Sequence, residues 1–357
     1  MERHCEAGDP HMTKRILVGG VPVGGGAPVT IQSMTNTPTH DVAATVAQIN
    51  RLAAAGCEIV RIAVPDMAAA KAVGKIKEQI TIPLVVDIHF NYRLALEAIE
   101  AGADKVRINP GNIGGEERVK AVAEACRRKG IPIRIGVNGG SLEKPLLAKY
   151  GGVTPEAMVE SAFGHIALLN RYDFDDICVS LKSSHVPTAM AAYRLMAEQS
   201  DYPLHLGVTE AGTVHMGTLK SAVGIGGLLA MGIGDTFRVT LTADPVEEIY
   251  AAKEILQAAG LRREGPELIA CPTCGRTKID LIPLAKAVEE RLKSVQKPVT
   301  VAVMGCAVNG PGEASAADVG IAGGDGEGLL FQKGKIVKKV PQECLLEELM
   351  KLIELLP

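Results

Sequence analysis

Short apolar, β-branched runs alternate with longer amphipathic segments through most of the first 262 residues. In the longer segments apolar residues recur every three or four positions, as one face of a helix requires. The short runs have the length and composition of buried strands. The predicted strands are residues 30–34, 58–64, 83–90, 105–109, 132–137, 176–181, 203–208 and 236–242. Helices are predicted at 41–55, 92–101, 116–129, 155–170 and 245–259, among others, and a Gly-rich hairpin at 19–26.

Residues at the ends of the helical segments support this division. A side chain that can cap a helix start, or a glycine that can adopt the left-handed conformation after a helix end, stands where each is needed. These residues are Asp41, Thr154 and Asp244 at starts, and Gly56, Gly102, Gly130 and Gly260 at ends. Eight strand-helix units predict an α/β fold, a closed parallel TIM (β/α)8 barrel. An open doubly wound sheet is the alternative, but no Gly-x-Gly-x-x-Gly follows the first strand.

The alternation stops after Gly260, at a charged connector of residues 262–266. We therefore predict a barrel domain at 1–262 and a small α+β domain at 263–357. In the second domain we expect a strand running into Cys271, a helix at 280–295 and a strand ending near Cys306. A strand at 319–322, a hairpin at 329–340 and a helix at 343–356 complete it. A domain of this size benefits from a metal that ties its loops together.

Composition narrows the class of protein. The 47% share of hydrophobic residues indicates a globular chain, and a net charge of -3 gives no reason to expect nucleic acid or an anionic membrane as partner. The sequence shows no signal peptide and no uncharged apolar run long enough to span a bilayer. We expect a cytoplasmic protein in which Cys57, Cys126 and Cys178 are buried, reduced thiols.

Three thiols in the second domain form the most specific chemical pattern of the chain. Cys271 and Cys274 have the spacing that lets one turn present two sulfurs to a metal, and Cys306 follows an apolar run. Structural zinc needs a fourth soft or imidazole ligand, and no histidine follows His215. A three-thiolate site suits a 4Fe-4S cluster with one iron open to an oxygen ligand, and Glu313 is the nearest carboxylate.

The other cysteines carry weaker signals. Cys344 opens the last predicted helix, and no role follows from its position. Cys5, between His4 and His11, could bind a metal, but a frayed terminus is the expected state.

Five predicted barrel strands each contain a cation among apolar residues. Because both faces of parallel strands are covered, such a charge must be paired or must point into the open end of the barrel. Gathered at the carboxyl ends of the strands, the cations would form a pocket for a polyanion, since guanidinium groups bind phosphate oxygens bidentately. The alternative is pairing with carboxylates such as Glu58 or Asp235. The cations are Arg61, Arg107, Arg134, Lys182 and Arg238.

Polar residues end the same strands. Asp87 and His89 alternate along one strand and so face the same side. Glu210, where a strand gives way to a Gly-containing loop, is the candidate general acid or base, unless it forms a salt bridge to one of the arginines. Asn109, Asn138 and Thr240 supply further hydrogen-bonding groups.

Several motifs together resemble the bacterial 4-hydroxy-3-methylbut-2-enyl diphosphate synthase family of the methylerythritol phosphate route to isoprenoids. They are Ile-Gln-Ser-Met-Thr at 31–35, Val-Arg-Ile-Asn-Pro-Gly-Asn at 106–112, Gly-Val-Thr-Glu-Ala-Gly at 207–212, Cys-Pro-Thr-Cys-Gly-Arg at 271–276 and Asn-Gly-Pro-Gly-Glu at 309–313. The resemblance covers essentially the whole chain. It implies a TIM barrel and a domain with a 4Fe-4S cluster held by Cys271, Cys274, Cys306 and Glu313.

The resemblance also implies an activity, the reductive opening of 2-C-methyl-D-erythritol 2,4-cyclodiphosphate with loss of water. It assigns the diphosphate to Arg61, His89, Arg107, Arg134, Asn138, Lys182, Arg238 and Thr240, and Asn109 is the ninth residue predicted to bind substrate. Glu210 would be the acid or base, supported by Asp87 and Asn109, and Glu313 the exchangeable ligand. Flavodoxin or ferredoxin would supply electrons, and the assembly would be a head-to-tail homodimer.

Two other functions remain open on the sequence alone. One is a lyase or aldolase that uses Lys182 as a Schiff-base lysine on a phosphosugar, with zinc tying the small domain together. The other is a regulatory protein that senses oxidants or iron through a cluster and binds a phosphorylated effector.

Overall fold

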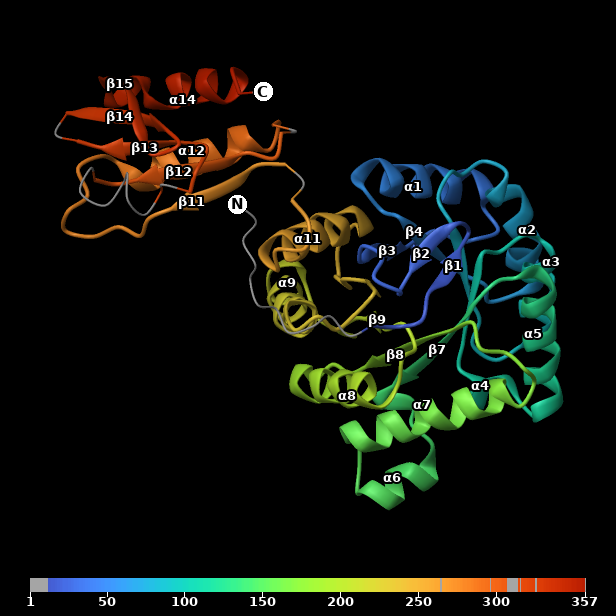
Figure 1. Cartoon of the computed structure of the whole chain (residues 1–357). Helices are drawn as coiled ribbons and strands as arrows, with labels where there is room; N and C mark the ends of the chain where they lie inside the picture. The colour runs from blue at the N-terminus through green and yellow to red at the C-terminus, as the bar shows by residue number, and fades with distance from the viewer. Residues whose placement is uncertain are drawn as a thin grey trace. The chain divides into compact units, whose positions relative to one another are not determined.

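The computed structural model describes residues 12–263, 265–295, 297–306, 314, 316–324 and 326–356. Glu313 and the His4, Cys5 and His11 group lie outside these ranges. The chain divides into two compact units, Met1–Arg262 and Arg263–Pro357, which are described separately (Figure 1). Among the described residues, no helix has both the length and the apolarity needed to cross a membrane.

Eight parallel strands form the centre of the first unit, in the order β8-β7-β6-β5-β4-β3-β10-β9. An isolated parallel bridge between Val179 and Leu204 joins the two ends of this sheet. The predicted closed barrel is therefore confirmed, and the open sheet is not formed. The strands are β3 (Thr30–Met34), β4 (Ile59–Ala63), β5 (Leu84–Asp87), β6 (Lys105–Ile108), β7 (Ile133–Asn138), β8 (Ile177–Lys182), β9 (His205–Leu206) and β10 (Thr236–Phe237).

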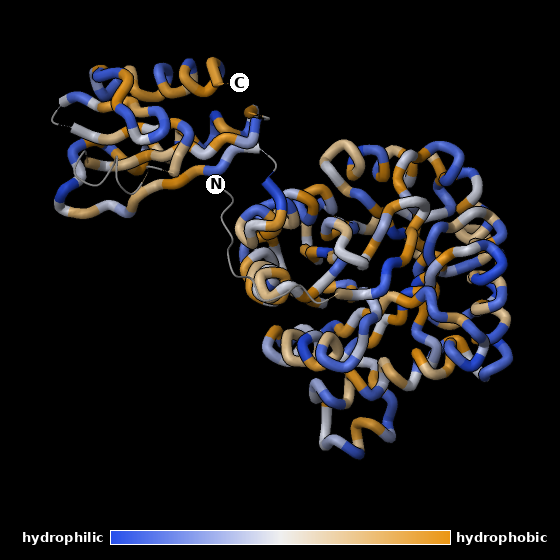
Figure 2. The backbone as a smooth tube through the Cα atoms, viewed as in Figure 1, coloured by the Kyte–Doolittle hydropathy of each residue, from blue (hydrophilic) through white to orange (hydrophobic). Residues whose placement is uncertain are grey.

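Helices surround the barrel and pack apolar faces against its strands (Figures 1 and 2). They are α1 (Val42–Ala55), α2 (Met67–Lys77), α3 (Tyr92–Glu100), α4 (Pro110–Ile113), α5 (Glu116–Lys129), α6 (Lys144–Tyr150), α7 (Pro155–Asn170), α8 (Val186–Gln199), α9 (Val214–Ser221), α10 (Gly227–Ala230) and α11 (Pro245–Ala258). Short 3-10 and π turns lie at Gly139–Ser141 and Ala222–Gly226. The predicted caps are present: Asp41, Thr154 and Asp244 accept backbone hydrogen bonds, and all four predicted glycines have positive φ.

The last two strands are shorter than the sequence predicts. We expected strands at 203–208 and 236–242, but ladder pairing is confined to β9 and β10. Beyond β10, the N–H of Leu241 donates to Glu248 Oε1 at 3.2 Å and that of Thr242 to the carbonyl of Gly212 at 2.9 Å. These donors are therefore used by a side chain and a loop, so the backbone leaves the sheet at the rim.

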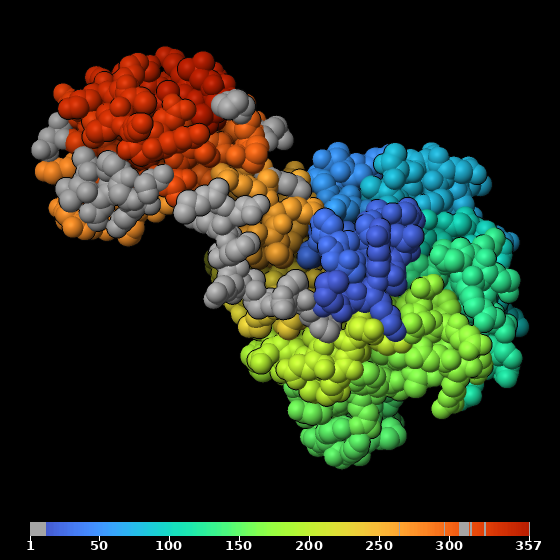
Figure 3. Space-filling view, in the orientation of Figure 1, coloured from blue at the N-terminus to red at the C-terminus, as the bar shows by residue number. Residues whose placement is uncertain are grey.

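A hairpin of β1 (Ile16–Val18) and β2 (Val21–Val23) covers the amino-terminal end of the barrel. Its buried side chains pack against Ile59, Val85 and Cys178 near the starts of three barrel strands. Figure 3 shows the hairpin in dark blue on the surface of this unit. The barrel is thus closed at this end, so its open end lies at the carboxyl ends of the strands.

The described residues of the second unit form a five-stranded mixed sheet and two helices. Its strands, paired in chain order, are β11 (Glu267–Ala270), β12 (Thr300–Met304), β13 (Val319–Gly323), β14 (Glu327–Gln332) and β15 (Lys335–Pro341). Helices α12 (Leu281–Leu292) and α14 (Leu345–Glu354), the latter preceded by a 3-10 turn at Gln342–Cys344, share one apolar core with the sheet. A second cluster that includes Ala302, Met304 and Phe331 covers the other face.

Candidate active site

A polar cavity of about 270 Å³ opens at the carboxyl ends of the barrel strands. All five strand cations line it. Arg107 and Arg134 are register partners on β6 and β7, and Lys182 stands opposite Asn138 at the end of β7. The lining residues are Arg61, Asp87, His89, Arg107, Arg134, Asn138, Ser180, Lys182, Thr209, Arg238 and Thr240. The structure therefore brings together eight of the nine residues predicted to bind substrate.

Asn109 is the ninth, and it does not line this cavity. It is buried at the end of β6, where its side chain caps α4 by accepting a hydrogen bond from the N–H of Gly111 at 3.0 Å. The Asn109 side chain therefore satisfies a backbone N–H in the first turn of α4 instead of lining the cavity.

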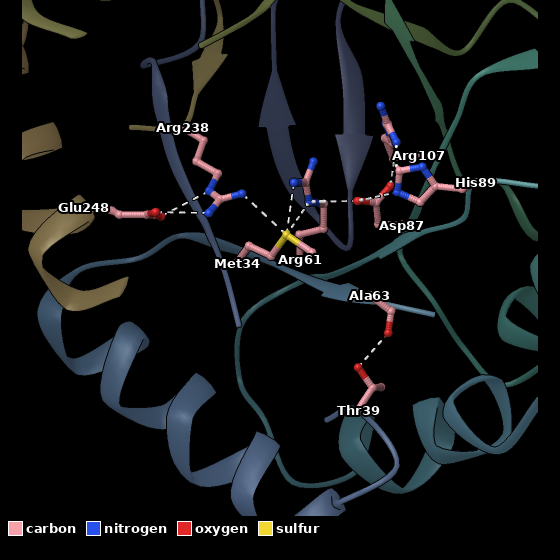
Figure 4. Close-up of polar contacts among 9 residues, drawn as sticks. All are labelled: Met34, Thr39, Arg61, Ala63, Asp87, His89, Arg107, Arg238 and Glu248. Atoms are coloured by element: carbon pink, nitrogen blue, oxygen red, sulfur yellow. Dashed lines mark hydrogen bonds and ion pairs between the residues drawn. The ribbon is translucent and has the colours of Figure 1, made fainter. Parts of the chain in front are cut away.

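Asp87 holds two of the arginines. Its Oδ1 accepts a hydrogen bond from Arg107 Nη1 at 2.9 Å, and its Oδ2 lies 3.6 Å from Arg61 Nε and 3.7 Å from His89 Nε2 (Figure 4). Burial would raise the pKa of this carboxyl, but Arg61, His89, Arg107 and Arg134 together hold its pKa well below the usual range. Asp87 is therefore a charged anchor for cations and not a proton donor.

Replacing Asp87 by asparagine should show how much the ionised carboxylate contributes to the stability of the fold. Since the folded-state pKa is below the unfolded value of about 3.9, the stabilisation is complete above that pH and fades as the pH falls toward the folded pKa. At pH 7 the variant should lose roughly 3–5 kcal/mol, because two buried cations lose their partner. Urea unfolding should show the difference shrinking below about pH 4. A Glu198→Gln control, which removes an exposed carboxylate, should give no such trend.

Arg238 is held by a different carboxylate, that of Glu248 in α11. The guanidinium donates from Nη2 to Oε1 at 3.0 Å and from Nε to Oε2 at 3.1 Å, and Ser33 Oγ donates to Oε2 at 2.8 Å. Glu248 is not among the residues predicted from the sequence to belong to the site. The pattern that could have indicated it is a carboxylate on the apolar face of the helix predicted at 245–259, where the residue is 2% exposed.

The alternative in which the strand cations pair with carboxylates is therefore realised in part, but the carboxylates are not Glu58 and Asp235. Glu58 binds Arg262 at 3.0 Å, and Asp235 accepts hydrogen bonds from Thr13 and from the backbone of Leu204. Asp87 and Glu248 take these places instead. They offer two negative charges near five cations, so the cavity retains an excess of positive charge.

Arg134 and Lys182 carry most of that excess. Within the described part of the chain neither has a carboxylate partner, and Nε and Nη1 of Arg134 are buried with no hydrogen bond. Burial and the neighbouring Arg107 lower the pKa of Arg134 to about 10. Burial, followed by repulsion from Arg134, Arg61, Arg238 and Arg107, lowers the pKa of Lys182 well below its usual range. A bound polyanion would stabilise the charged forms of Arg134 and Lys182 and so raise both pKa values again.

Two glycines inside the barrel make room for these side chains. A Cβ atom at Gly207 would lie 2.6 Å from Lys182 Nζ, and one at Gly136 would lie 2.7 Å from Arg107 Nε. No larger residue fits without moving a cation. Gly207 belongs to a motif noted in the sequence, but this packing reason is visible only in the structure.

Glu210 lies in a second, larger cavity of about 650 Å³ that shares Asn138 and Thr209 with the cationic one. Its carboxylate is exposed, and its backbone has φ of +53°, a conformation that costs energy for a residue other than glycine. The rest of this lining is rich in hydroxyl groups, including Ser141, Ser183 and Thr188. Glu210 is therefore placed beside the cationic cavity without forming a salt bridge to its arginines among the described contacts.

The three thiols belong to the second unit. Cys271 follows β11 and Cys306 follows β12, and these neighbouring strands are parallel, so both residues leave the sheet at the same edge. The N–H of Gly305 donates to Cys271 Sγ at 3.0 Å. Hydrogen bonds from Arg276 lower the pKa of the exposed Cys274 thiol. This donor set suits an iron-sulfur cluster, because thiolates are the usual protein ligands of its iron atoms.

The described thiols do not form a closed ligand group. In the parts of the chain that are described, no three histidine, cysteine or carboxylate side chains converge as a metal site. The predicted fourth ligand, Glu313, lies outside the described residues. The structure thus places Cys271 and Cys306 beyond the same ends of two paired strands, with Cys274 three residues after Cys271 in the loop that follows β11.

Two family models match the chain, the GcpE TIM-barrel domain over residues 13–253 and the GcpE protein C-terminal domain over residues 267–355. The chain belongs to the GcpE family. Both halves of the family's architecture are accordingly present. A solved 7,8-dihydropteroate synthase from Vibrio fischeri is similar over 69% of this chain and 98% of its own, with 13% identity and a TM-score of 0.49.

Relatives in the GcpE family are named 4-hydroxy-3-methylbut-2-en-1-yl diphosphate synthase (flavodoxin). The protein from Caldanaerobacter subterraneus is 61% identical over 96% of this chain and 97% of its own. That from Clostridium perfringens is 62% identical over 96% and 98%, and that from Bacillus subtilis is 60% identical over 96% and 91%.

Proposed function

We propose that this chain is a 4-hydroxy-3-methylbut-2-enyl diphosphate synthase that reductively opens 2-C-methyl-D-erythritol 2,4-cyclodiphosphate. The observation that carries the proposal is the cavity lined by five cations, of which Arg134 and Lys182 have no carboxylate partner among the described residues. A site with this charge selects a ligand with several phosphate oxygens. The identity of about 60% to synthases over nearly the full chain supports the same reaction.

In this proposal the barrel unit binds the substrate. Arg61, Arg107, Arg134, Lys182 and Arg238 surround the diphosphate, while His89, Asn138 and Thr240 donate further hydrogen bonds. Asp87 keeps Arg61 and Arg107 in place. The carbon part of the substrate faces the larger cavity, where Glu210 can deliver or accept a proton. Asn109 supports α4 and not the ligand.

The second unit holds the redox group in this proposal. Cys271, Cys274 and Cys306 would bind a 4Fe-4S cluster, with Glu313 as the fourth and exchangeable ligand. When bound, such a cluster supplies electrons and a Lewis acid at one iron. Ring opening with loss of one water consumes two electrons and one proton. Glu210 is the residue placed to move that proton.

Two partners belong to the proposal. Flavodoxin is the proposed electron donor, because the names of the relatives include it; ferredoxin is the alternative. A head-to-tail homodimer would let the second unit of one chain close the barrel of another. Cross-linking between the two units in the presence of substrate tests that assembly.

Anaerobic turnover with and without reductant tests the proposed reaction. Full-length protein loaded with iron and sulfide should consume the cyclodiphosphate only when a low-potential donor is present. The rival Schiff-base reaction through Lys182 requires no reductant and would leave a lysine adduct after borohydride treatment. A borohydride adduct at Lys182 together with turnover without reductant would overturn the proposal.

Binding of the cyclodiphosphate should be accompanied by proton uptake. Lys182 has a lowered pKa in the empty site because of burial and four arginines, and a bound polyanion raises that pKa again. The two phosphates of this ligand are diesters, so they do not themselves titrate near pH 8. Calorimetry without reductant, in two buffers of different ionisation enthalpy, should give different heats. Equal heats, or unchanged uptake in Lys182→Met, would contradict this.

A further inference from the structure

Met34 lies between two arginines of the cationic cavity. Strand β3, which carries it, stands between β4 and β10 in the sheet, and Met34 is directly opposite Arg61 in the β3–β4 register. Its Sδ lies 3.0 Å from Nη2 and 3.2 Å from Nε of Arg61, and 3.4 Å from Nη1 of Arg238 (Figure 4). One thioether therefore accepts hydrogen bonds from two guanidinium groups that come from different strands.

Each of these guanidinium groups is also held on its other side. Arg61 lies 3.6 Å from Asp87, and Arg238 forms two hydrogen bonds to Glu248. The cavity lining includes both arginines but not Met34, so the thioether contacts the two guanidinium groups without itself lining the cavity. The two cations repel each other, and without a shared neighbour each could turn fully toward its carboxylate.

The chemistry of the thioether suits this position. Its sulfur is polarizable and accepts hydrogen bonds weakly, and it carries no charge. A carboxylate here would also fix the arginines, but it would cancel charge that a phosphate group needs. A leucine would fill the same volume without accepting any hydrogen bond. Met34 can therefore orient the two arginines and leave the net charge of the cavity unchanged.

We propose that Met34 is a positioning residue of the diphosphate site, which holds Arg61 and Arg238 toward the cavity without neutralising them. The inference rests on the proposed function, because it concerns the same site. It explains why a methionine stands in the Ile-Gln-Ser-Met-Thr segment, whose Ser33 orients Glu248 from the opposite face of β3. β3 thereby supports Arg238 through two successive residues.

Calorimetric titration of the full-length protein with inorganic pyrophosphate tests the inference without turnover. Met34→Leu keeps the volume but removes the acceptor, and pyrophosphate should bind about five- to tenfold more weakly. Met34→Gln keeps a neutral acceptor and should bind within about threefold of the wild type. Met158→Leu, a buried methionine of α7, is the matched control and should change nothing.

Kinetics separate positioning from simple packing. In turnover assays Met34→Leu should raise KM by a similar factor and change kcat less than about twofold. Pyrophosphate affinity within twofold of the wild type in a folded Met34→Leu protein would overturn the inference. If that variant does not fold, a tenfold loss in Met34→Gln would overturn it equally. Pyrophosphate binding by wild type without reduction of the cyclodiphosphate would instead contradict the proposed reaction alone.

Discussion

Cys306→Ser is expected to abolish turnover, with a loss of at least about 1,000-fold, and to remove the visible absorbance of the anaerobic protein. A serine hydroxyl is a far poorer ligand for iron than a thiolate, and the proposed ligand set contains only two other thiols, Cys271 and Cys274. The variant should contain far less iron and sulfide per chain than the wild type.

The division of the chain into two units makes this prediction selective. The cationic cavity belongs to residues 1–262, so Cys306→Ser should bind pyrophosphate as the wild type does. Cys344→Ser is the control, since it removes a thiol of the same unit that lies outside the proposed ligand set, and it should keep both colour and turnover. A coloured, active Cys306→Ser protein would remove Cys306 from the proposed ligand set.

Glu210→Gln is expected to lower kcat by about 100- to 10,000-fold, the usual range for loss of a general acid or base. The amide has the shape of the carboxylate and stands in an exposed position, so the strained backbone and the cavity should be unchanged. The cyclodiphosphate should still bind within about threefold, because the cations that surround it lie in the adjoining cavity. Stopped assays give kcat, and calorimetry without reductant gives binding.

Glu198→Gln serves again as the control for loss of an exposed carboxylate, and it should turn over normally. A Glu210→Gln protein with full activity would refute the proton-transfer role. A protein that loses binding as much as turnover would instead make Glu210 a binding residue. The kcat from stopped assays and the affinity from calorimetry together distinguish these two outcomes.

Much of the barrel could be predicted because its signals are local. Apolar runs define the strands, and Gly56 and Gly130 mark helix ends through a backbone conformation that favours glycine. The cations could be predicted to gather, since a charge in a doubly covered strand has few places to go and the strands share one open end. In the second unit the sequence predicted a strand before Cys271 and another before Cys306, and the parallel pairing of β11 and β12 then brings the two chain ends side by side.

What the sequence did not reveal depends on contacts between distant residues. Met34 bridges residues 61 and 238, and the partner of Arg238 is Glu248 on a helix outside the sheet. No local pattern pairs these positions, so Glu58 and Asp235 were named instead. An asparagine at a strand end can face a ligand or cap the next helix, and it took the fold to show that the Asn109 side chain caps α4.

The most direct test is product formation by the anaerobic, cluster-loaded wild-type protein with reduced flavodoxin and 2-C-methyl-D-erythritol 2,4-cyclodiphosphate. The account predicts one molecule of 4-hydroxy-3-methylbut-2-enyl diphosphate for each two electrons withdrawn from the donor. Cyclodiphosphate that binds but is never reduced, under conditions where the cluster itself is reduced, would contradict it.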